Sequence, residues 1–141
     1  MDEKAYYEKV EVKIQCPKMD HVVQELVDWI ETFTISFQGK LNNQLYTIQA
    51  TDIFYIESIE NKTFLYCDDQ VFENTLKLYE IEERTNQTNM IRISKNMILN
   101  IEKVGSVRAL FNGKFEATLI NNEKVIVNRH YVKAFKAKFL K

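Results

Sequence analysis

Residues 53–73, IFYIESIENKTFLYCDDQVFE, decide the fold that this sequence predicts. Two runs rich in β-branched and aromatic residues are separated by polar residues near Asn61-Lys62, and a third run begins after Asp68-Asp69. Short runs of this kind, bounded by polar turn residues, are typical of β-strands. The segment therefore predicts three consecutive strands joined by tight turns.

The residues that follow extend this pattern to the end of the chain. A short helix is expected to end near Arg84, and further strands are expected around Ile91 to Ile93 and over residues 104–111, 115–120 and 124–127. Asn112-Gly113 is the strongest short-range hairpin signal in the chain. From about His130, aromatic residues recur every four positions, which predicts a closing helix with lysines on its other sides.

The residues before this segment predict a smaller unit. Alternating apolar residues over 10–16 predict a strand, and helical periodicity over 19–33 predicts an amphipathic helix capped by Asp20. Its expected buried side carries Val23, Leu26, Val27, Ile30 and Phe33, and its expected solvent side carries Glu25, Asp28 and Glu31. A hairpin is expected to turn around residues 39–43.

These elements predict an α+β fold that is mainly β, with antiparallel strands and short helices. We expect a strand-helix-strand extension over residues 1–45 and the main domain over residues 46–141. A chain of 141 residues with 45% apolar residues, three Gly and one Pro is sufficient for one compact core. No long apolar run or signal peptide is evident, which predicts a cytoplasmic protein. Cys16 and Cys67 lie in strand-like contexts without CxxC or Cys/His spacing, which predicts buried thiols rather than a metal pair or a disulfide.

Charge is divided unevenly along the chain. Residues 1–83 hold 7 Lys/Arg against 17 Asp/Glu, a balance of -10, whereas residues 84–141 hold 12 against 3, a balance of +9. Local positive potential is what a protein needs in order to approach nucleic-acid phosphates. An uneven division of surface charge by chance is the alternative, and the charge count alone does not separate the two.

Catalytic and cofactor motifs are not found in the sequence. It lacks GxGxxG, P-loop, HExxH and GxSxG patterns. His21 and His130 both fall at expected helix starts, where imidazoles commonly point to solvent. We therefore predict no enzyme activity, no cofactor and no metal site.

Two segments combine an apolar strand with a polar and basic turn. They are RISKNMILN over residues 92–100 and VIVNRHYV over residues 125–132. Arg, Lys, Asn and His are the side chains that read base edges or bind phosphates. The alternative is a pair of ordinary polar turns, with Asn96 and Asn128 capping short helices.

The order of these segments resembles the LytTR family of DNA-binding domains. The resemblance is carried by Tyr55-Ile56-Glu57-Ser58, Asn61-Lys62-Thr63, residues 90–100, residues 104–120 and residues 127–132, about two-thirds of the chain. It implies an elongated, mainly β domain that inserts loops, rather than a recognition helix, into successive major grooves. It also implies a bacterial transcription regulator that binds double-stranded DNA.

The resemblance carries over to individual positions. The residues that it places at the DNA are Lys62, Thr63, Lys95, Asn96 and Arg129, with His130 and Lys133 as nearby backbone support. Arg92 fits the motif equally well as a DNA contact or as a structural residue. Asn96 and Asn128 stand where the family usually has Ser, and Lys95 where Arg is common, so no target sequence carries over.

Partners are implied as well. One small domain buries little DNA surface, so we expect a homodimer on repeated half-sites. Residues 1–45 are too few for a receiver domain, and the resemblance extends to compact regulators that a small membrane protein restrains. The acidic N-terminal unit would offer the partner or dimer surface, and an interaction module that acts through this unit alone is the alternative function.

Overall fold

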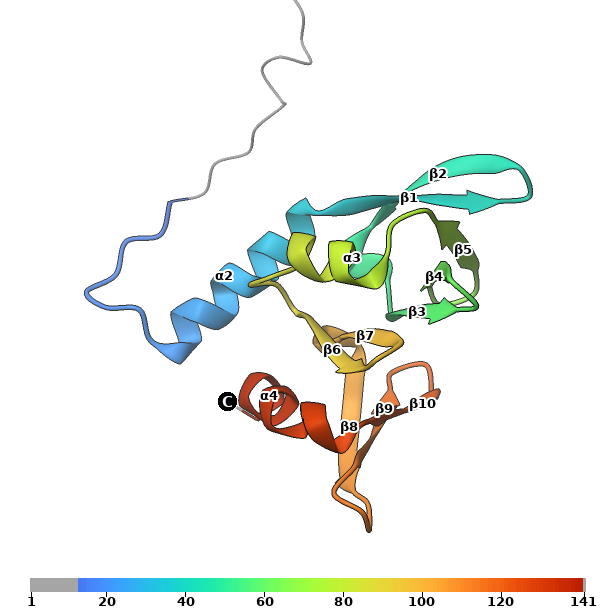
Figure 1. Ribbon diagram of the computed structural model, residues 1–141. Coiled ribbons are helices and arrows are strands. Elements are labelled where there is room, and N and C mark those ends of the chain that lie inside the picture. The colour runs from blue at the N-terminus through green and yellow to red at the C-terminus, as the bar shows by residue number, and fades with distance from the viewer. Residues whose placement is uncertain (1–12, 141) are drawn as a thin grey trace, which may run out of the picture.

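The computed structural model describes residues 13–140, which form two antiparallel β-sheets and three α-helices (Figure 1). The larger sheet has seven strands in the order β2-β1-β5-β4-β3-β7-β6, and the smaller has three in the order β10-β9-β8. The larger sheet consists of β1 (Ser36–Leu41), β2 (Gln44–Gln49), β3 (Tyr55–Ile59), β4 (Lys62–Tyr66), β5 (Val71–Asn74), β6 (Met90–Ser94) and β7 (Met97–Asn100). The smaller consists of β8 (Val104–Ala109), β9 (Phe115–Leu119) and β10 (Lys124–Val127). The predicted mainly β, antiparallel fold is confirmed.

The helices lie outside the sheets. They are α2 (His21–Thr34), α3 (Leu78–Arg84) and α4 (Arg129–Phe139), with single 3₁₀ turns η1 (Ala50–Asp52) and η2 (Ile101–Lys103). Figure 1 shows α3 on one side of the β6–β7 hairpin, and the smaller sheet with α4 on the other. Both faces of this part of the larger sheet are therefore covered.

Two cores result from this layering. Successive residues of a strand point to opposite faces, so Ile98 belongs to the core under α3, whereas Leu99 belongs to the core shared with the smaller sheet and α4. Ile56 and Tyr55 of β3 divide in the same way. Tyr55 also joins the two sheets, because its hydroxyl donates a 2.8 Å hydrogen bond to the carboxylate of Glu123.

Tight turns set the strand register. Asn42 and Asn43 between β1 and β2, and Glu60 and Asn61 between β3 and β4, all have positive φ. Two successive residues of positive φ make the turn whose twist matches antiparallel strands, and Asn tolerates that conformation best after Gly. Gly39, which the sequence predicted to lie in the turn, is instead a buried residue of β1.

Several predictions for the N-terminal unit require correction. Helix α2 begins as predicted, with the Asp20 carboxylate accepting a 2.9 Å hydrogen bond from the Val23 N–H. Residues 13–16 form no strand, Cys16 is exposed rather than buried, and residues 10–12 of the predicted strand lie outside the described residues.

The orientation of α2 also differs from the prediction. Asp28, expected in solvent, is buried and forms an ion pair with Lys138 of α4 at 3.5 Å. Leu26 and Phe33, expected in the core, are exposed. The helix therefore attaches to the domain partly through polar contacts.

The expected division at residues 45 and 46 falls inside β2. Strands of one continuous sheet thus stand on both sides of it. The division into an extension and a main domain stays a prediction.

Candidate nucleic-acid interface

The turn between β6 and β7 is held by a single arginine. The Nε of Arg92 donates a 2.7 Å hydrogen bond to the Ser94 carbonyl, and a terminal guanidinium nitrogen donates to the Lys95 carbonyl. The Ser94 hydroxyl accepts a 3.1 Å hydrogen bond from the Asn96 N–H. The side chains of Lys95 and Asn96 are exposed at the tip of this braced turn.

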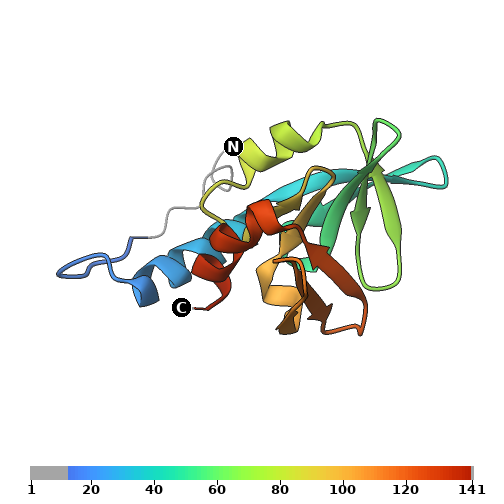
Figure 2. The same ribbon diagram turned by 60° about the horizontal axis from the view of Figure 1, so that its bottom comes forward.

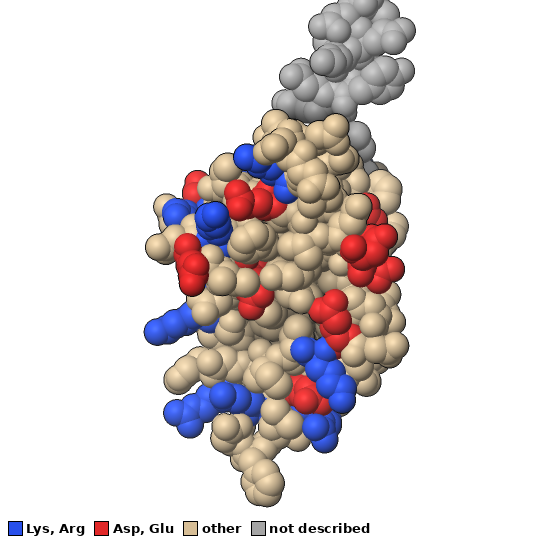
Figure 3. All heavy atoms as spheres, turned by 90° about the vertical axis from the view of Figure 1, so that its right-hand side faces the viewer, with Lys and Arg blue, Asp and Glu red and all other residues tan. Residues whose placement is uncertain are grey.

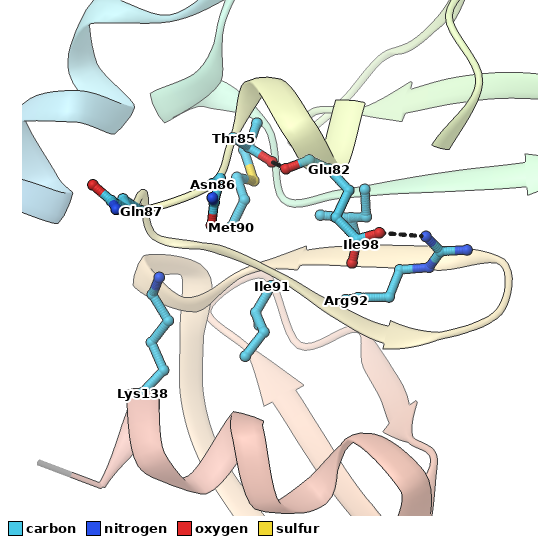
Figure 4. A pocket seen from close by; sticks show the side chains of 9 residues that line it. All are labelled: Glu82, Thr85, Asn86, Gln87, Met90, Ile91, Arg92, Ile98 and Lys138. Atoms are coloured by element: carbon cyan, nitrogen blue, oxygen red, sulfur yellow. Dashed lines mark hydrogen bonds and ion pairs between the residues drawn. The ribbon is translucent and has the colours of Figure 1, made fainter. Parts of the chain in front are cut away.

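The Arg92 side chain has a further partner across a small pocket. Its other terminal nitrogen forms a 3.1 Å ion pair with Glu82 of α3. Figure 4 shows this pair above the β6–β7 hairpin, with Lys138 reaching toward the same 190 Å³ pocket from α4. These contacts, all within the protein, support a structural role for Arg92 in the turn.

The β3–β4 hairpin ends beside the β6–β7 turn. Strand β3 pairs antiparallel with β7, and the Ser58 N–H donates a 2.8 Å hydrogen bond to the Asn96 carbonyl. The β3–β4 turn follows the end of β3, and the β6–β7 turn precedes the start of β7. Because β3 and β7 are antiparallel, both turns lie at the same end of the larger sheet. Lys62, the first residue of β4, is exposed at this end.

Thr63 occupies a different environment from its neighbour Lys62. It is 2% exposed, and its hydroxyl donates a 2.7 Å hydrogen bond to the Leu76 carbonyl. This places Thr63 in the interior, where it holds β4 to the segment before α3. Its burial counts against the direct DNA contact that the sequence predicted.

The junction between β10 and α4 reaches the same end of the larger sheet. The Asn128 N–H donates a 2.8 Å hydrogen bond to the Ile93 carbonyl of β6. A depression of about 350 Å³ lies between this junction and the β6–β7 turn. It is lined by Ser94, Lys95, Asn96, Asn128, His130 and Tyr131.

The first turn of α4 carries exposed basic side chains and no acidic one. Asn128 is its N-cap residue but its side chain makes no capping hydrogen bond, and the first turn contains no acidic residue. Arg129 and His130 instead supply basic, exposed side chains there. The N-terminus of a helix is already positive, so the charge of Arg129 is unfavourable for the isolated helix and suits an anion such as a phosphate.

The β8–β9 turn lies beside Arg129. Gly113 in the β8–β9 turn has φ of +79°, and a side chain there would lie 3.6 Å from the Arg129 Cβ. The turn therefore passes close to the base of the Arg129 side chain. Lys133 is exposed one helical turn further along α4.

The strand pairing brings most of the predicted residues to one end of the protein. Lys62, Lys95, Asn96, Arg129 and His130 lie on adjoining turns, with Lys133 next to them on α4. Figure 3 looks onto the face to which the hairpin turns of the larger sheet point, and Lys and Arg side chains project from both edges of its lower half. Sequence reasoning left open the role of Arg92 and missed Ser94 as its carbonyl partner. The position of Ser94, a polar residue between two strands, was the sequence signal that could have indicated this contact.

Residues 13–140 contain no group of three His, Cys, Asp or Glu side chains that could hold a metal ion. Within the same residues, no helix has the length and apolar character to cross a membrane.

Comparison with known proteins identifies relatives among regulators. A sensory transduction protein LytT of Enterococcus faecalis is 33% identical over 104 residues, 74% of this chain and 42% of that protein. The transcriptional regulatory protein LytR of Staphylococcus aureus is 27% identical over 110 residues, 78% of this chain and 45% of LytR. The chain thus spans less than half the length of these relatives.

A further relative and one solved structure extend the comparison. An uncharacterized HTH-type transcriptional regulator of Staphylococcus aureus is 26% identical over 127 residues, 89% of this chain and 86% of that protein. The LytTr DNA-binding domain of a response regulator from Bacillus cereus shares the fold, with a TM-score of 0.69 and 18% identity over 73% of this chain and 94% of that structure.

The family itself follows from a match to most of the chain. The model of the LytTr DNA-binding domain matches residues 43–140, which include all three turns that carry the basic residues. The predicted family is confirmed, and it is a family of DNA-binding domains rather than of enzymes. This chain belongs to the LytTR family.

Proposed function

We propose that this protein is a sequence-specific transcription regulator that binds double-stranded DNA by inserting its turns into the major groove. The observation that carries the proposal is the convergence of the β3–β4 turn, the β6–β7 turn and the β10–α4 junction at one end of the sheet. A two-stranded hairpin is narrow enough to enter the major groove of B-form DNA. The names of the relatives LytT and LytR support a regulatory role.

Each exposed side chain has a role that suits its chemistry. Arg129 carries a forked guanidinium that can bind guanine or phosphate through two hydrogen bonds, and Lys95 can bind the same groups as a point charge. Asn96 offers an amide for base edges. Lys62, His130 and Lys133 are assigned to the phosphate backbone, where charge rather than geometry decides affinity.

Pre-formed turns favour binding of this kind. The Arg92 guanidinium donates to the successive backbone carbonyls of Ser94 and Lys95, where β6 enters the turn, so little backbone entropy is lost when the turn meets DNA. Arg92 is thus a positioning residue in this proposal, and Thr63 has no part in the contact.

A titration of the full-length protein with fluorescent duplex DNA tests the proposal. The probe is the region upstream of its own gene, measured at two salt concentrations against a scrambled duplex. We expect specific binding that weakens steeply with salt and that falls roughly 10- to 100-fold in Arg129→Ala. Lys18→Ala is the matched control, since Lys18 is exposed before α2 and its loss removes the same charge.

The alternative is a domain that has lost DNA affinity and acts through its acidic N-terminal unit. Absence of binding to any duplex at low salt would favour it and sink the DNA proposal. Equal losses in Arg129→Ala and Lys18→Ala would leave a general charge effect and remove the assigned interface. Restraint by a small membrane protein stays a prediction that rests on the family resemblance.

A further inference from the structure

Helix α2 exposes a continuous apolar stripe. Val22, Leu26, Trp29 and Phe33 are 61%, 48%, 45% and 60% exposed, although all are large apolar residues. Their spacings of four, three and four residues place them within about 60° of arc on one side of the helix. Met19, just before the helix, is also exposed, and the rings of Trp29 and Phe33 stack with centroids 5.7 Å apart.

A neighbouring side of α2 is fixed to the domain by polar contacts. Asp28 is buried, accepts a 2.8 Å hydrogen bond from the Gln24 amide and pairs with Lys138. Thr32 is also buried, and its hydroxyl accepts a 2.7 Å hydrogen bond from the Asn89 N–H. The residues that α2 buries fully are thus polar, its apolar residues Val23, Val27 and Ile30 are only half-buried, and the large apolar residues of the stripe are exposed, which is unusual for a surface helix.

The contacts of Asp28 and Thr32 explain why α2 does not rotate to bury the apolar stripe. Rotation of α2 about its axis would break the Asp28 and Thr32 contacts and would leave buried polar groups without partners, at a cost that exceeds the gain from a few apolar contacts. The stripe therefore stays on the surface of the single chain. The largest exposed apolar patch of a monomer is often a functional surface.

We propose that the stripe is the seam of a homodimer, in which α2 pairs with α2 of a second copy. Apolar residues at alternating spacings of three and four are the a and d positions of a helix pair. A symmetric interface must be complementary to itself, and an apolar stripe without charged members satisfies this requirement. Trp29 and Phe33 are the residue types that dominate such interfaces when they are buried.

The exposed charges on α2 itself argue against nucleic acid as the occupant of the stripe. The exposed charges on α2 are the acidic Glu25 and Glu31, which repel phosphates. Figures 1 and 2 both show α2 at the opposite end of the molecule from the β1–β2 and β3–β4 hairpin turns. A dimer through α2 leaves the proposed DNA interface of each copy free, and so presents two such interfaces to one duplex.

The area of the seam sets the expected affinity between the two copies. The exposed apolar side chains together offer on the order of 500 Å² per copy, since a single aromatic residue can bury ~200 Å². A symmetric pair then buries roughly 1,000 Å², which is the lower limit of a specific interface. We expect a dissociation constant on the order of 10–100 μM, with dimers favoured on DNA that holds two adjacent half-sites.

The oligomeric state of the full-length protein tests the proposal. Sedimentation equilibrium over roughly 1–500 μM should show a reversible monomer–dimer transition. Trp29 is the only tryptophan of the chain, so its fluorescence should shift to shorter wavelength over the same range as its ring leaves water. Leu26→Glu places a charge at the centre of the seam in both copies and should raise the dissociation constant by at least ~30-fold.

A matched control separates the seam from general surface effects. Leu45→Glu makes the same substitution at a 70% exposed leucine of β2 and should leave dimerisation unchanged, with circular dichroism confirming that both variants fold. A wild-type protein that stays monomeric at all concentrations overturns the proposal. So does a dimer that Leu26→Glu does not weaken, or a Trp29 emission that already lies at short wavelength in the monomer, which would mean that residues 1–12 or another segment covers the stripe.

These measurements distinguish failure of the dimer proposal from failure of the proposed DNA interface. The Leu26→Glu variant should bind a single half-site as well as the wild type does, but lose the steeper binding to a two-site duplex. If neither protein binds DNA while the wild type dimerises, the proposed function is wrong and the dimer stands.

Discussion

The role of Arg92 could not be decided from the sequence alone. The motif around it was consistent with a DNA contact or with a structural role. The choice depends on two backbone carbonyls of its own turn and on Glu82 of α3. The Glu82 partner comes from an element whose position depends on the whole sheet, so no local pattern could have indicated it.

Substitution at Arg92 should affect stability, whereas substitution at Lys95 should affect only binding. Arg92→Lys keeps the charge but loses the forked donor, and we expect it to destabilise the protein by about 1–2 kcal/mol. Amide hydrogen exchange should become faster at Asn96, whose N–H lies in the braced turn. Lys95→Ala should leave the urea midpoint unchanged, and a stable Arg92→Lys variant with normal exchange would contradict the bracing role.

The two cysteines should differ sharply in reactivity. Burial, together with the nearby Asp52 and Asp69 carboxylates, raises the pKa of the Cys67 thiol to about 11. A thiol with this pKa has a thiolate fraction at neutral pH that is roughly 100-fold smaller than that of an ordinary thiol. Alkylation with iodoacetamide near pH 7.5 should therefore modify the exposed Cys16 first and Cys67 far more slowly.

Single-cysteine variants assign the two rates. Cys16→Ser should remove the fast phase and Cys67→Ser the slow phase, as followed by mass spectrometry. Addition of urea should bring Cys67 to the rate of an ordinary thiol, since both its burial and the neighbouring carboxylates are lost on unfolding. Equal rates for the two cysteines in the folded protein would refute the expected difference.

At the scale of elements, strands and turns were predicted far better than the orientation of α2. Strands β3 to β5 and β8 to β10 follow from apolar runs and turn residues, which are local signals. Helix α2 has apolar residues on two sides, with Val23, Val27 and Ile30 half-buried on one and the exposed stripe on the other. Which side meets the domain depends on Asp28 and Lys138, whose pairing across the whole chain has no local sequence signal.

The same limit applies to Gly39, which was expected in a turn and lies in β1. A Cβ at this position would lie 2.7 Å from the Cβ of Phe72 and 2.9 Å from a side-chain carbon of Ile48, closer than such atoms can approach. Gly39→Ala should therefore force β1 and β5 apart and destabilise the protein by about 1–3 kcal/mol. Urea denaturation measures the change.

Gly105→Ala is the matched control for Gly39→Ala. A Cβ at Gly105 would have only ordinary van der Waals contacts, the nearest at 3.5 Å to the Thr118 carbonyl oxygen. Stability should then change little or increase slightly, because alanine reduces the entropy of the unfolded chain. Equal losses in both variants would mean that the close approach of Phe72 is not the cause.

At the scale of the whole molecule, a pair of tyrosines joins the two sheets. The rings of Tyr55 and Tyr66 stack with centroids 4.3 Å apart. The Tyr55 hydroxyl donates to Glu123 before β10, and the Tyr66 hydroxyl donates a 3.1 Å hydrogen bond to Glu57 of β3. Neither the stacking nor the link to the smaller sheet has a sequence signal, because each depends on how the sheets fold onto one another.

The link between the sheets should weaken at alkaline pH. Burial raises the pKa of both tyrosines above the ordinary value, and hydrogen bonds to the neighbouring carboxylates raise it further. The folded state thus favours the neutral phenols, so their contribution to stability is fully present below pH ~10 and is lost as the pH rises toward the folded-state pKa. Tyr55→Phe should lower the free energy of unfolding by about 1 kcal/mol at pH 8 through the lost hydrogen bond, and should make the decline in stability above pH 10 shallower than in the wild type.

Tyr79→Phe is the control, since Tyr79 is exposed on α3. Urea denaturation from pH 8 to 11 measures all three proteins, and a decline of equal slope in wild type and Tyr55→Phe would show that the junction does not sense pH.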